Sequence, residues 1–87
     1  MRRSEGSVFA IFRHSDLKLY THGYPGSWNA FPRFQSYANK AAASRQRNKL
    51  ESEKRRTDEV RVRNGAEPST EEFSIAEIKV VIEFPDQ

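Results

Sequence analysis

Residues 7–13 read Ser-Val-Phe-Ala-Ile-Phe-Arg, and this stretch decides the fold of the 87-residue chain. β-branched and aromatic residues dominate it, which is typical of a β-strand. Successive side chains of a strand point to opposite faces, so Phe9 and Ile11 lie on the face opposite to Ala10. Because both faces of the stretch are apolar, we predict that this strand is central in its sheet.

A second strand is predicted directly after a short turn. Residues 14–16 read His-Ser-Asp, a composition that is typical of turns. Residues 17–21 read Leu-Lys-Leu-Tyr-Thr, and their alternation indicates a strand with Leu17 and Leu19 on one face. The two strands together predict a β-hairpin.

The C-terminal part of the chain contains the longest strand signal. Residues 73–84 read Phe-Ser-Ile-Ala-Glu-Ile-Lys-Val-Val-Ile-Glu-Phe, and Pro85 follows at once. Proline cannot donate to a strand ladder, so we expect the strand to end before it. We predict that this strand pairs beside residues 7–13, which makes the first strand central.

A basic, alanine-rich helix is predicted in the middle of the chain. Ser36 is a good N-cap, and the helix is expected to run from about Tyr37 to about Arg56. Its alanines, among them Ala38, Ala41 and Ala42, would lie against a sheet. The last three turns contain only one apolar residue, Leu50, so this half either projects into solvent or docks on a partner.

Residues 57–71 carry two competing signals. Residues 59–63 alternate around Val60, and Asn64-Gly65 is a strong hairpin-turn dipeptide, which together favour a short strand and turn. Residues 66–70 have loop composition, which favours a flexible linker. Both alternatives, a hairpin and a flexible linker, remain open from the sequence.

The order strand, strand, helix, undecided segment, strand predicts one small α+β domain that spans residues 1–87. The economical arrangement is a small antiparallel sheet, in the pattern ββα(β)β, with the helix packed across one face. The net charge is +3, but residues 1–63 hold fourteen Lys and Arg against six Asp and Glu. Residues 64–87 hold one Lys against six Asp and Glu, so the acidic strand either compensates the basic helix or leaves it as an exposed basic surface.

Aromatic residues gather in the loop of residues 21–35, directly before the basic helix. Tyr24-Pro25-Gly26-Ser27 fits a type II turn inside this loop. Rings supply rigid apolar area and cations supply reach and steering, so the loop and the helix together predict a contact surface. The candidate partner-binding residues are Tyr24, Trp28, Phe31, Arg45, Arg47, Lys49, Lys54, Arg55 and Arg56.

The aromatic residues of the loop are not expected to behave alike. A domain with a thin core needs large side chains as a lid, so we expect Phe31 and Phe34 to be buried. Tyr24 and Trp28 flank the Pro-Gly turn and are expected to be exposed.

No pattern in the chain indicates catalysis or a bound cofactor. The chain has no cysteine and only two histidines, His14 and His22, so the usual zinc spacings are missing and no metal site is expected. No nucleophile elbow or phosphate-binding glycine motif is present. We therefore expect a protein that is not an enzyme. Without a signal peptide or a membrane-spanning stretch, we expect it to be soluble, cytoplasmic and without a membrane partner.

The layout resembles the small accessory proteins of tailed bacteriophages. The residues that carry the resemblance are Val8–Phe12, Leu17–Tyr20, Ser36–Ala43 and Phe73–Phe84. The resemblance covers about half of the chain and concerns architecture, so it transfers no functional residue. It implies a role in which the protein binds and redirects or inhibits a host macromolecule, commonly one that handles nucleic acid, in the host cytoplasm.

Two functions are therefore predicted from the sequence. In the first, the chain docks on a host protein of nucleic-acid processing or defence and inhibits it. In the second, it binds DNA or RNA directly through the same cations and rings. A homodimer is also possible, because a thin sheet with an exposed edge can pair with a second copy.

Overall fold

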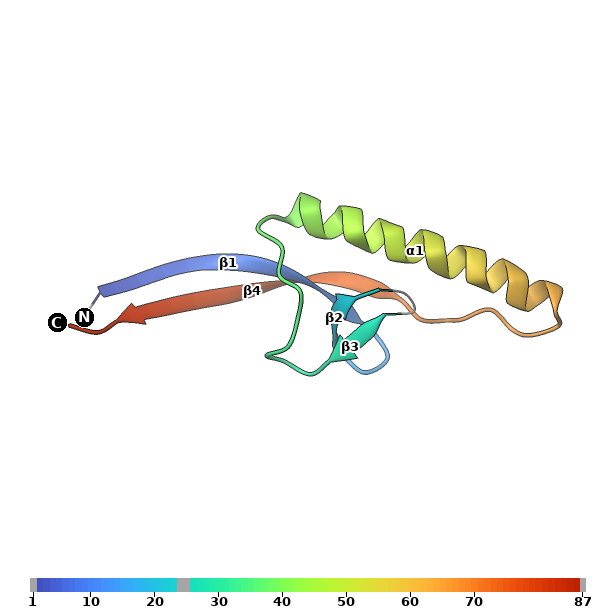
Figure 1. Ribbon diagram of the computed structural model, residues 1–87, viewed down its shortest axis with the longest axis horizontal. Coiled ribbons are helices and arrows are strands. Elements are labelled where there is room, and N and C mark those ends of the chain that lie inside the picture. The colour runs from blue at the N-terminus through green and yellow to red at the C-terminus, as the bar shows by residue number, and fades with distance from the viewer. Residues whose placement is uncertain (1, 24–25, 87) are drawn as a thin grey trace.

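The computed structural model describes residues 2–23 and 26–86, which form one four-stranded antiparallel sheet and one long helix. The helix packs against the sheet, so the predicted small α+β fold is confirmed (Figure 1). The strands lie in the order β3-β2-β1-β4. The elements are β1 (Arg2–Arg13), β2 (Leu19–His22), β3 (Ser27–Asn29), α1 (Lys40–Arg63) and β4 (Phe73–Phe84).

The pairing of β1 with β4 is the longest feature of the sheet. It runs through twelve opposed pairs, from Arg2 opposite Phe84 to Arg13 opposite Phe73. β1 lies between β2 and β4, which confirms that it is central, and β4 has the predicted bounds. β1 begins five residues earlier than predicted, at Arg2, because β4 is long enough to pair with this polar segment.

The hairpin from β1 to β2 is present, but β2 begins at Leu19 and not at Leu17. The amide of Arg13 donates to the carbonyl of Lys18, and that of Leu17 donates to Arg13. Leu17 therefore belongs to the turn, where it has a φ of +58° and is 70% exposed. The predicted shared face of Leu17 and Leu19 is wrong, because the connection between the strands is two residues longer than its composition indicates.

The aromatic loop of residues 21–35 contains a short strand that the sequence did not indicate. β3 pairs with β2, with Trp28 opposite Tyr20. Gly26 has a φ of +103°, as the third position of the predicted turn requires. Tyr24 and Pro25 of that turn lie outside the described residues.

The helix begins at Lys40 and its N-cap is Asn39, so the predicted cap at Ser36 is wrong. The Asn39 side chain accepts a hydrogen bond from the amide of Ala42 at 2.9 Å. Tyr37 cannot be helical, because its backbone exchanges two hydrogen bonds with Phe9, at 2.8 and 2.9 Å. This bridge extends the sheet along the edge of β1 and delays the start of the helix.

The helix is also longer than predicted and ends at Arg63. Residues 57–63 are therefore helical, and neither a linker nor a hairpin describes them. Asn64-Gly65 ends the helix: the Asn64 amide donates to Val60, and Gly65 has a φ of +84°. The dipeptide is a C-cap, where left-handed glycine is as useful as in a hairpin turn.

The core lies between α1 and one face of the sheet. Its buried residues are Ile11, Tyr20, Leu50 and Phe73, with Trp28 and Tyr37 packed against them. The helix contributes Leu50 and Ala43. The predicted contact through Ala38 and Ala41 is wrong: Ala38 precedes the helix, and Ala41 lies on the side opposite to Ala43 and Leu50. Ala42 is half-buried.

The N-cap supplies a direct test of the helix start. We expect Asn39→Ala to lower the free energy of unfolding by about 1 kcal/mol, because the Ala42 amide loses its acceptor. Ser36→Ala is the matched control and should change stability by less than about 0.5 kcal/mol. Urea denaturation followed by circular dichroism measures both, and a larger loss for Ser36→Ala would contradict the observed cap.

Candidate partner-binding surface

Trp28, predicted as an exposed anchor, is part of the packed aromatic cluster. Its ring stacks on Phe73 with centroids 5.1 Å apart and meets Tyr20 edge-on at 5.4 Å. The guanidinium of Arg13 lies 5.1 Å from the centroid of the indole. The expectation of an exposed Trp28 is therefore wrong, because pairing of β3 with β2 carries the ring onto the core face.

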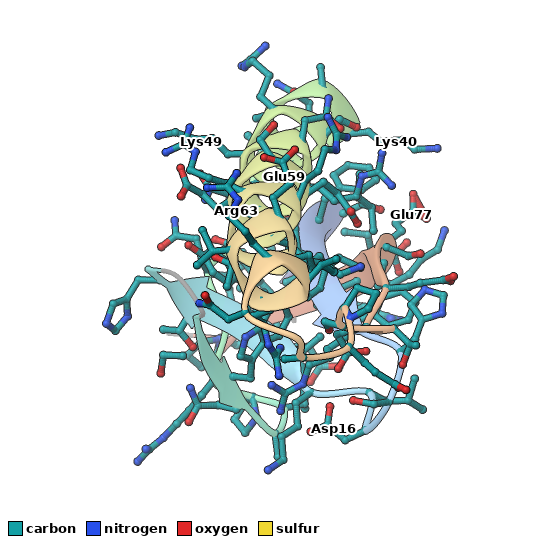
Figure 2. All side chains as sticks on the ribbon, turned by 90° about the vertical axis from the view of Figure 1, so that its right-hand side faces the viewer. Asp16, Lys40, Lys49, Glu59, Arg63 and Glu77 are labelled. Atoms are coloured by element: carbon teal, nitrogen blue, oxygen red, sulfur yellow. The ribbon has the colours of Figure 1, made fainter. Side chains whose placement is uncertain are left out.

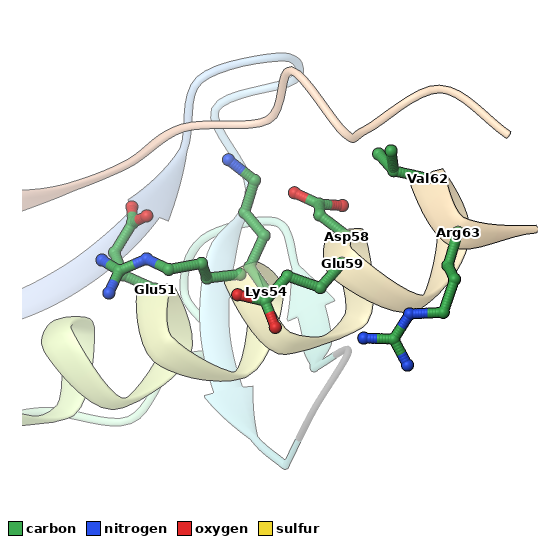
Figure 3. Close-up of a pocket in the computed structure, with 7 residues that line it drawn as sticks. Glu51, Lys54, Asp58, Glu59, Val62 and Arg63 are labelled. Atoms are coloured by element: carbon green, nitrogen blue, oxygen red, sulfur yellow. The ribbon is translucent and has the colours of Figure 1, made fainter. Parts of the chain in front are cut away.

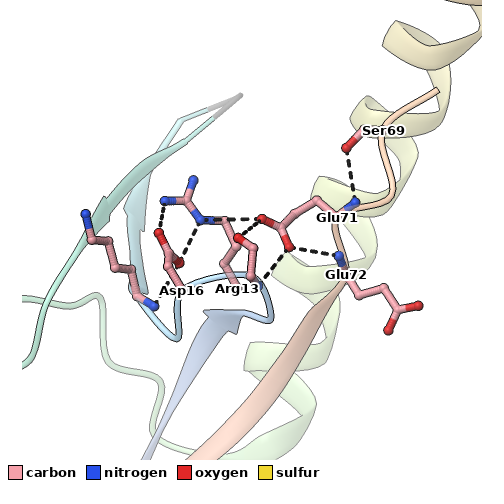
Figure 4. A network of polar contacts seen from close by, with 7 residues as sticks. Arg13, Asp16, Ser69, Glu71 and Glu72 are labelled. Carbon is pink, nitrogen blue, oxygen red and sulfur yellow. Dashed lines mark hydrogen bonds and ion pairs between the residues drawn. The ribbon is translucent and has the colours of Figure 1, made fainter. Parts of the chain in front are cut away.

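A polar network around Arg13 holds this end of the sheet together (Figure 4). Arg13 donates to both carboxylate oxygens of Asp16, at 2.6 and 3.0 Å, and forms an ion pair with Glu71 at 3.6 Å. The Ser15 hydroxyl donates to the Glu71 carboxylate at 2.5 Å. The network ties the β1–β2 turn to the start of β4. The hydrogen bonds from Arg13 lower the pKa of Asp16 from 3.8 to about 2.

Phe31 is exposed, as was expected of Trp28. It is 67% exposed, and its ring stacks on Phe34 with centroids 6.0 Å apart. The expectation that Phe31 is a buried lid is wrong, while Phe34 is half-buried. Tyr24, the third predicted aromatic contact, lies outside the described residues.

Four exposed cations line one side of α1, and we call Arg45, Lys49, Arg56 and Arg63 the cationic flank. Spacings of four, seven and seven residues keep their side chains within about 40° of one another on an α-helix. The flank extends about 27 Å along the helix. Figure 2 shows Lys49 and Lys40 on opposite sides of α1.

The cationic flank has few partners within the described part of the chain. Arg56 forms an exposed ion pair with Glu53 at 3.7 Å. Among the described residues, the side chains of Arg45, Lys49 and Arg63 make no hydrogen bond or ion pair. No ion pair of residues 2–23 and 26–86 joins α1 to β4, so the acidic strand does not neutralise the flank through direct contacts.

The remaining predicted cations lie elsewhere on α1. Arg47 is half-buried, and its Nε is buried without a hydrogen-bond partner. Lys54 and Arg55 line an open groove of about 620 Å³ beside the helix, and Arg63 of the flank lines it too (Figure 3). Carboxylates of Glu51, Asp58 and Glu59 share this groove, so its charge is nearly balanced. Lys54 and Arg55 therefore lie in a charge-balanced groove that borders the cationic flank at Arg63.

Sequence reasoning missed Arg63 as a member of the flank. The sequence shows that Arg63 follows Arg56 by seven residues, but the helix was predicted to end at Arg56. Once α1 continues to Arg63, the heptad spacing brings both arginines to one side.

The structure brings together His14, Ser74 and Glu72: His14 Nε2 lies 2.6 Å from the Ser74 hydroxyl, and His14 Nδ1 lies 3.8 Å from the Glu72 carboxylate. Across residues 2–23 and 26–86, no three His, Asp or Glu side chains gather where they could hold a metal ion. The described part of the chain has no helix that is both long and apolar enough to cross a membrane. The cationic flank, the Phe31–Phe34 pair and the exposed parts of the sheet are further surface features of the described residues.

Comparisons with known proteins add no functional information. The chain matches no protein-family model, no curated protein and no solved structure.

The packing of Trp28 predicts a large effect on stability. We expect Trp28→Ala to lower the free energy of unfolding by about 3 kcal/mol, because it removes a ring that contacts Phe73 and Tyr20. Phe31→Ala should change it by less than about 0.5 kcal/mol, since Phe31 is exposed. Chemical denaturation measures both, and equal losses in the two variants would contradict the assignment.

The Arg13–Asp16 contact predicts a dependence of stability on pH. The folded pKa of Asp16 is lowered, so its contribution is complete above the unfolded pKa and is lost as pH falls toward about 2. We expect wild type to lose more stability than Asp16→Asn between about pH 4 and about pH 2. Thermal unfolding at several pH values measures this difference, and parallel curves for the two proteins would contradict it.

Proposed function

We propose that this protein is a non-enzymatic binding protein that docks the cationic flank of α1 on an acidic surface of a partner protein. The observation that carries the proposal is the alignment of four exposed cations, three of them without partners among the described residues. Cations aligned in this way steer association with an acidic surface and fix its orientation.

Exposed apolar residues favour a protein as the partner. The Phe31 ring is exposed and already stacked on Phe34, so it is ordered before binding. Val60 is 50% exposed and follows Arg56 by one helical turn, beside the flank. Rigid aromatic and apolar anchors combined with arginines are typical of the residues that dominate protein interfaces.

Carboxylates close to the flank favour the same conclusion. Glu53 is bound to Arg56, and Glu59 lies on the neighbouring side of the helix. Next to a phosphate backbone these carboxylates would be repelled, whereas a protein surface can offer complementary charges of both signs. The partner is therefore expected to carry acidic residues with some basic ones among them.

The narrower form of the proposal concerns the class of partner. The layout of a hairpin, an Ala/Lys-rich helix and a closing strand supports an accessory protein of bacteriophage type. Its target would be a host protein of nucleic-acid processing or defence. Inhibition would be steric, because a small domain bound at a functional surface excludes the macromolecule that normally occupies it.

Direct binding of DNA or RNA is the second candidate. The specific observation in its favour is the length of the cationic flank, about 27 Å, which is enough to contact several phosphates. The aromatic contribution to this candidate is smaller than the sequence indicated. Trp28 is packed on Phe73 and is not free to stack on bases.

Charge reversal on the flank tests the proposal. The variant combines Arg45→Glu, Lys49→Glu and Arg63→Glu, three exposed residues without ion pairs in the described structure. We expect it to lose recovery of the partner from a bacterial lysate by about tenfold or more, since each contact contributes about 0.5–1 kcal/mol. Affinity capture with quantitative mass spectrometry measures the recovery.

The matched control reverses three exposed cations away from the flank, Lys18→Glu, Lys40→Glu and Arg61→Glu, with the same change in net charge. It should recover the same protein as wild type. Fluorescence anisotropy with a DNA duplex and with single-stranded RNA at two salt concentrations tests the second candidate. Salt-sensitive nucleic-acid binding lost only in the flank variant, without any captured protein, would overturn docking on a protein.

A further inference from the structure

The distal half of the β1–β4 pair projects from the rest of the fold as a two-stranded arm (Figure 1). We define the arm as residues 2–8 of β1 and residues 78–84 of β4, which pair with each other throughout. β2 opposes β1 only near Phe12, and the Tyr37 bridge lies at Phe9. Within the described residues the arm therefore has no third strand, and its two edges are open.

The arm is amphipathic, although neither face is covered. Residues directly opposite in an antiparallel pair share a face, so Ile82 lies with Ser4 and Val80 with Gly6. That face holds Ile78, Val80, Ile82 and Phe84, while the other holds Arg3, Glu5, Lys79 and Glu83 around Val81. Ile82 and Phe84 are each 48% exposed.

An isolated two-stranded ribbon is only marginally stable in water, and a third strand or a packed face is needed to support it. The outer edge of β4 could supply that support. It has no proline between Phe73 and Phe84, and its pairing with β1 shows no bulge, so neither common form of edge protection is present. A long, apolar and regular edge of this kind is a template for another strand.

We propose that this strand is β4 of a second copy, and that two chains form a dimer through antiparallel β4–β4 pairing centred on Val81. In this register Lys79 lies opposite Glu83 of the second copy, and the two-fold axis repeats the pair. Val80 lies opposite Ile82 of the second copy on the apolar face. Pro85 ends the ladder on both sides because it has no amide to donate.

Charge complementarity selects this register over its neighbours. A shift that changes faces would set charged residues against apolar ones. Centring on Val80 would oppose Glu77 with Glu83, and centring on Lys79 would oppose two lysines, both of which are unfavourable. Centring on Ile78 would set the Glu83 carboxylate opposite Phe73, which is buried in the core. The Ile78 register also sets Glu77 opposite Lys79, so the burial of Phe73 is what excludes it. The Val81 register pairs opposite charges without burying a carboxylate against the core.

The dimer does not depend on the proposed partner surface. The cationic flank lies on α1, which packs on the other end of the β1–β4 pair (Figure 1). Failure of the dimer would leave docking through the flank intact, and the reverse also holds.

Exchange of charges between copies tests the proposal. We expect wild type to sediment as a dimer at micromolar concentration. Lys79→Glu alone and Glu83→Lys alone should each weaken the dimer by about tenfold, because like charges then face each other twice. An equimolar mixture of the two variants should restore it, since opposite charges meet again in the heterodimer. Analytical ultracentrifugation measures the oligomeric state of all four samples: wild type, the two single variants and their mixture. Circular dichroism confirms that each variant is folded.

Two further variants make the register falsifiable. Glu77→Lys is the matched control for Glu83→Lys: it lies on the same face but beyond the ladder, opposite Pro85 of the second copy. Glu77 pairs with Lys79 of its own strand at 3.5 Å, and losing this pair leaves Lys79 available to Glu83 of the second copy. It should leave the dimer unchanged. Because the chain has no cysteine, Val81→Cys should form a disulfide-linked dimer across the two-fold axis, and Glu77→Cys should not.

Several outcomes would overturn the proposal. One is a wild-type protein that stays monomeric at millimolar concentration. A second is a mixture of the two charge variants that fails to restore the dimer. A third is dissociation by Glu77→Lys without dissociation by Glu83→Lys, which would require a different register.

Discussion

The structure depends on the antiparallel pairing of β1 with β4 over twelve residues. Near its proximal end this pair presents Ile11 and Phe73 on one face, and every other core element reaches that face. Tyr20 and Trp28 arrive through β2 and β3, and Leu50 arrives from the helix. Without the β1–β4 pair these three side chains would have no common surface to cover. Because that surface is short, the buried core is small. The end of the helix and the distal half of the β1–β4 pair both extend beyond it.

The two extensions explain why so much of a small protein is exposed. The helix contributes only Ala43 and Leu50 to the buried interior, so its last three turns present charge to solvent on most sides. The distal half of the β1–β4 pair carries on one face the half-exposed Ile82 and Phe84 beside the partly buried Ile78 and Val80. One extension is cationic and the other is amphipathic, so they suit different kinds of partner. The polar network around Arg13 stabilises the region between them, where the first turn meets the start of β4.

Sequence reasoning was successful where side-chain alternation extended over many residues. The central position of β1, the bounds of β4 and the α+β class follow from such patterns. It failed where a short segment carries signals for more than one kind of structure. Val60 and Val62 alternate with arginines, which favoured a short strand. The structure instead places both valines in the helix, which continues to Arg63. The exposures expected for Trp28 and Phe31 were reversed because three residues of β3 decide which ring reaches the core, and so short a strand leaves no periodic signal. Which of the cationic residues share one side of the helix depended on where the helix ends.

The distance along the chain between β1 and β4 has a consequence for how the protein folds. Arg13 pairs with Phe73, so a loop of roughly 60 residues must close before the central strand gains its second neighbour. The β1–β2–β3 meander and α1 need only local contacts and can form earlier. Leu50 and Trp28 then become fully packed when Phe73 joins the core. Closure of this loop is accordingly expected to be the slow step of folding, and until it occurs the chain exposes the apolar surface that later becomes its core.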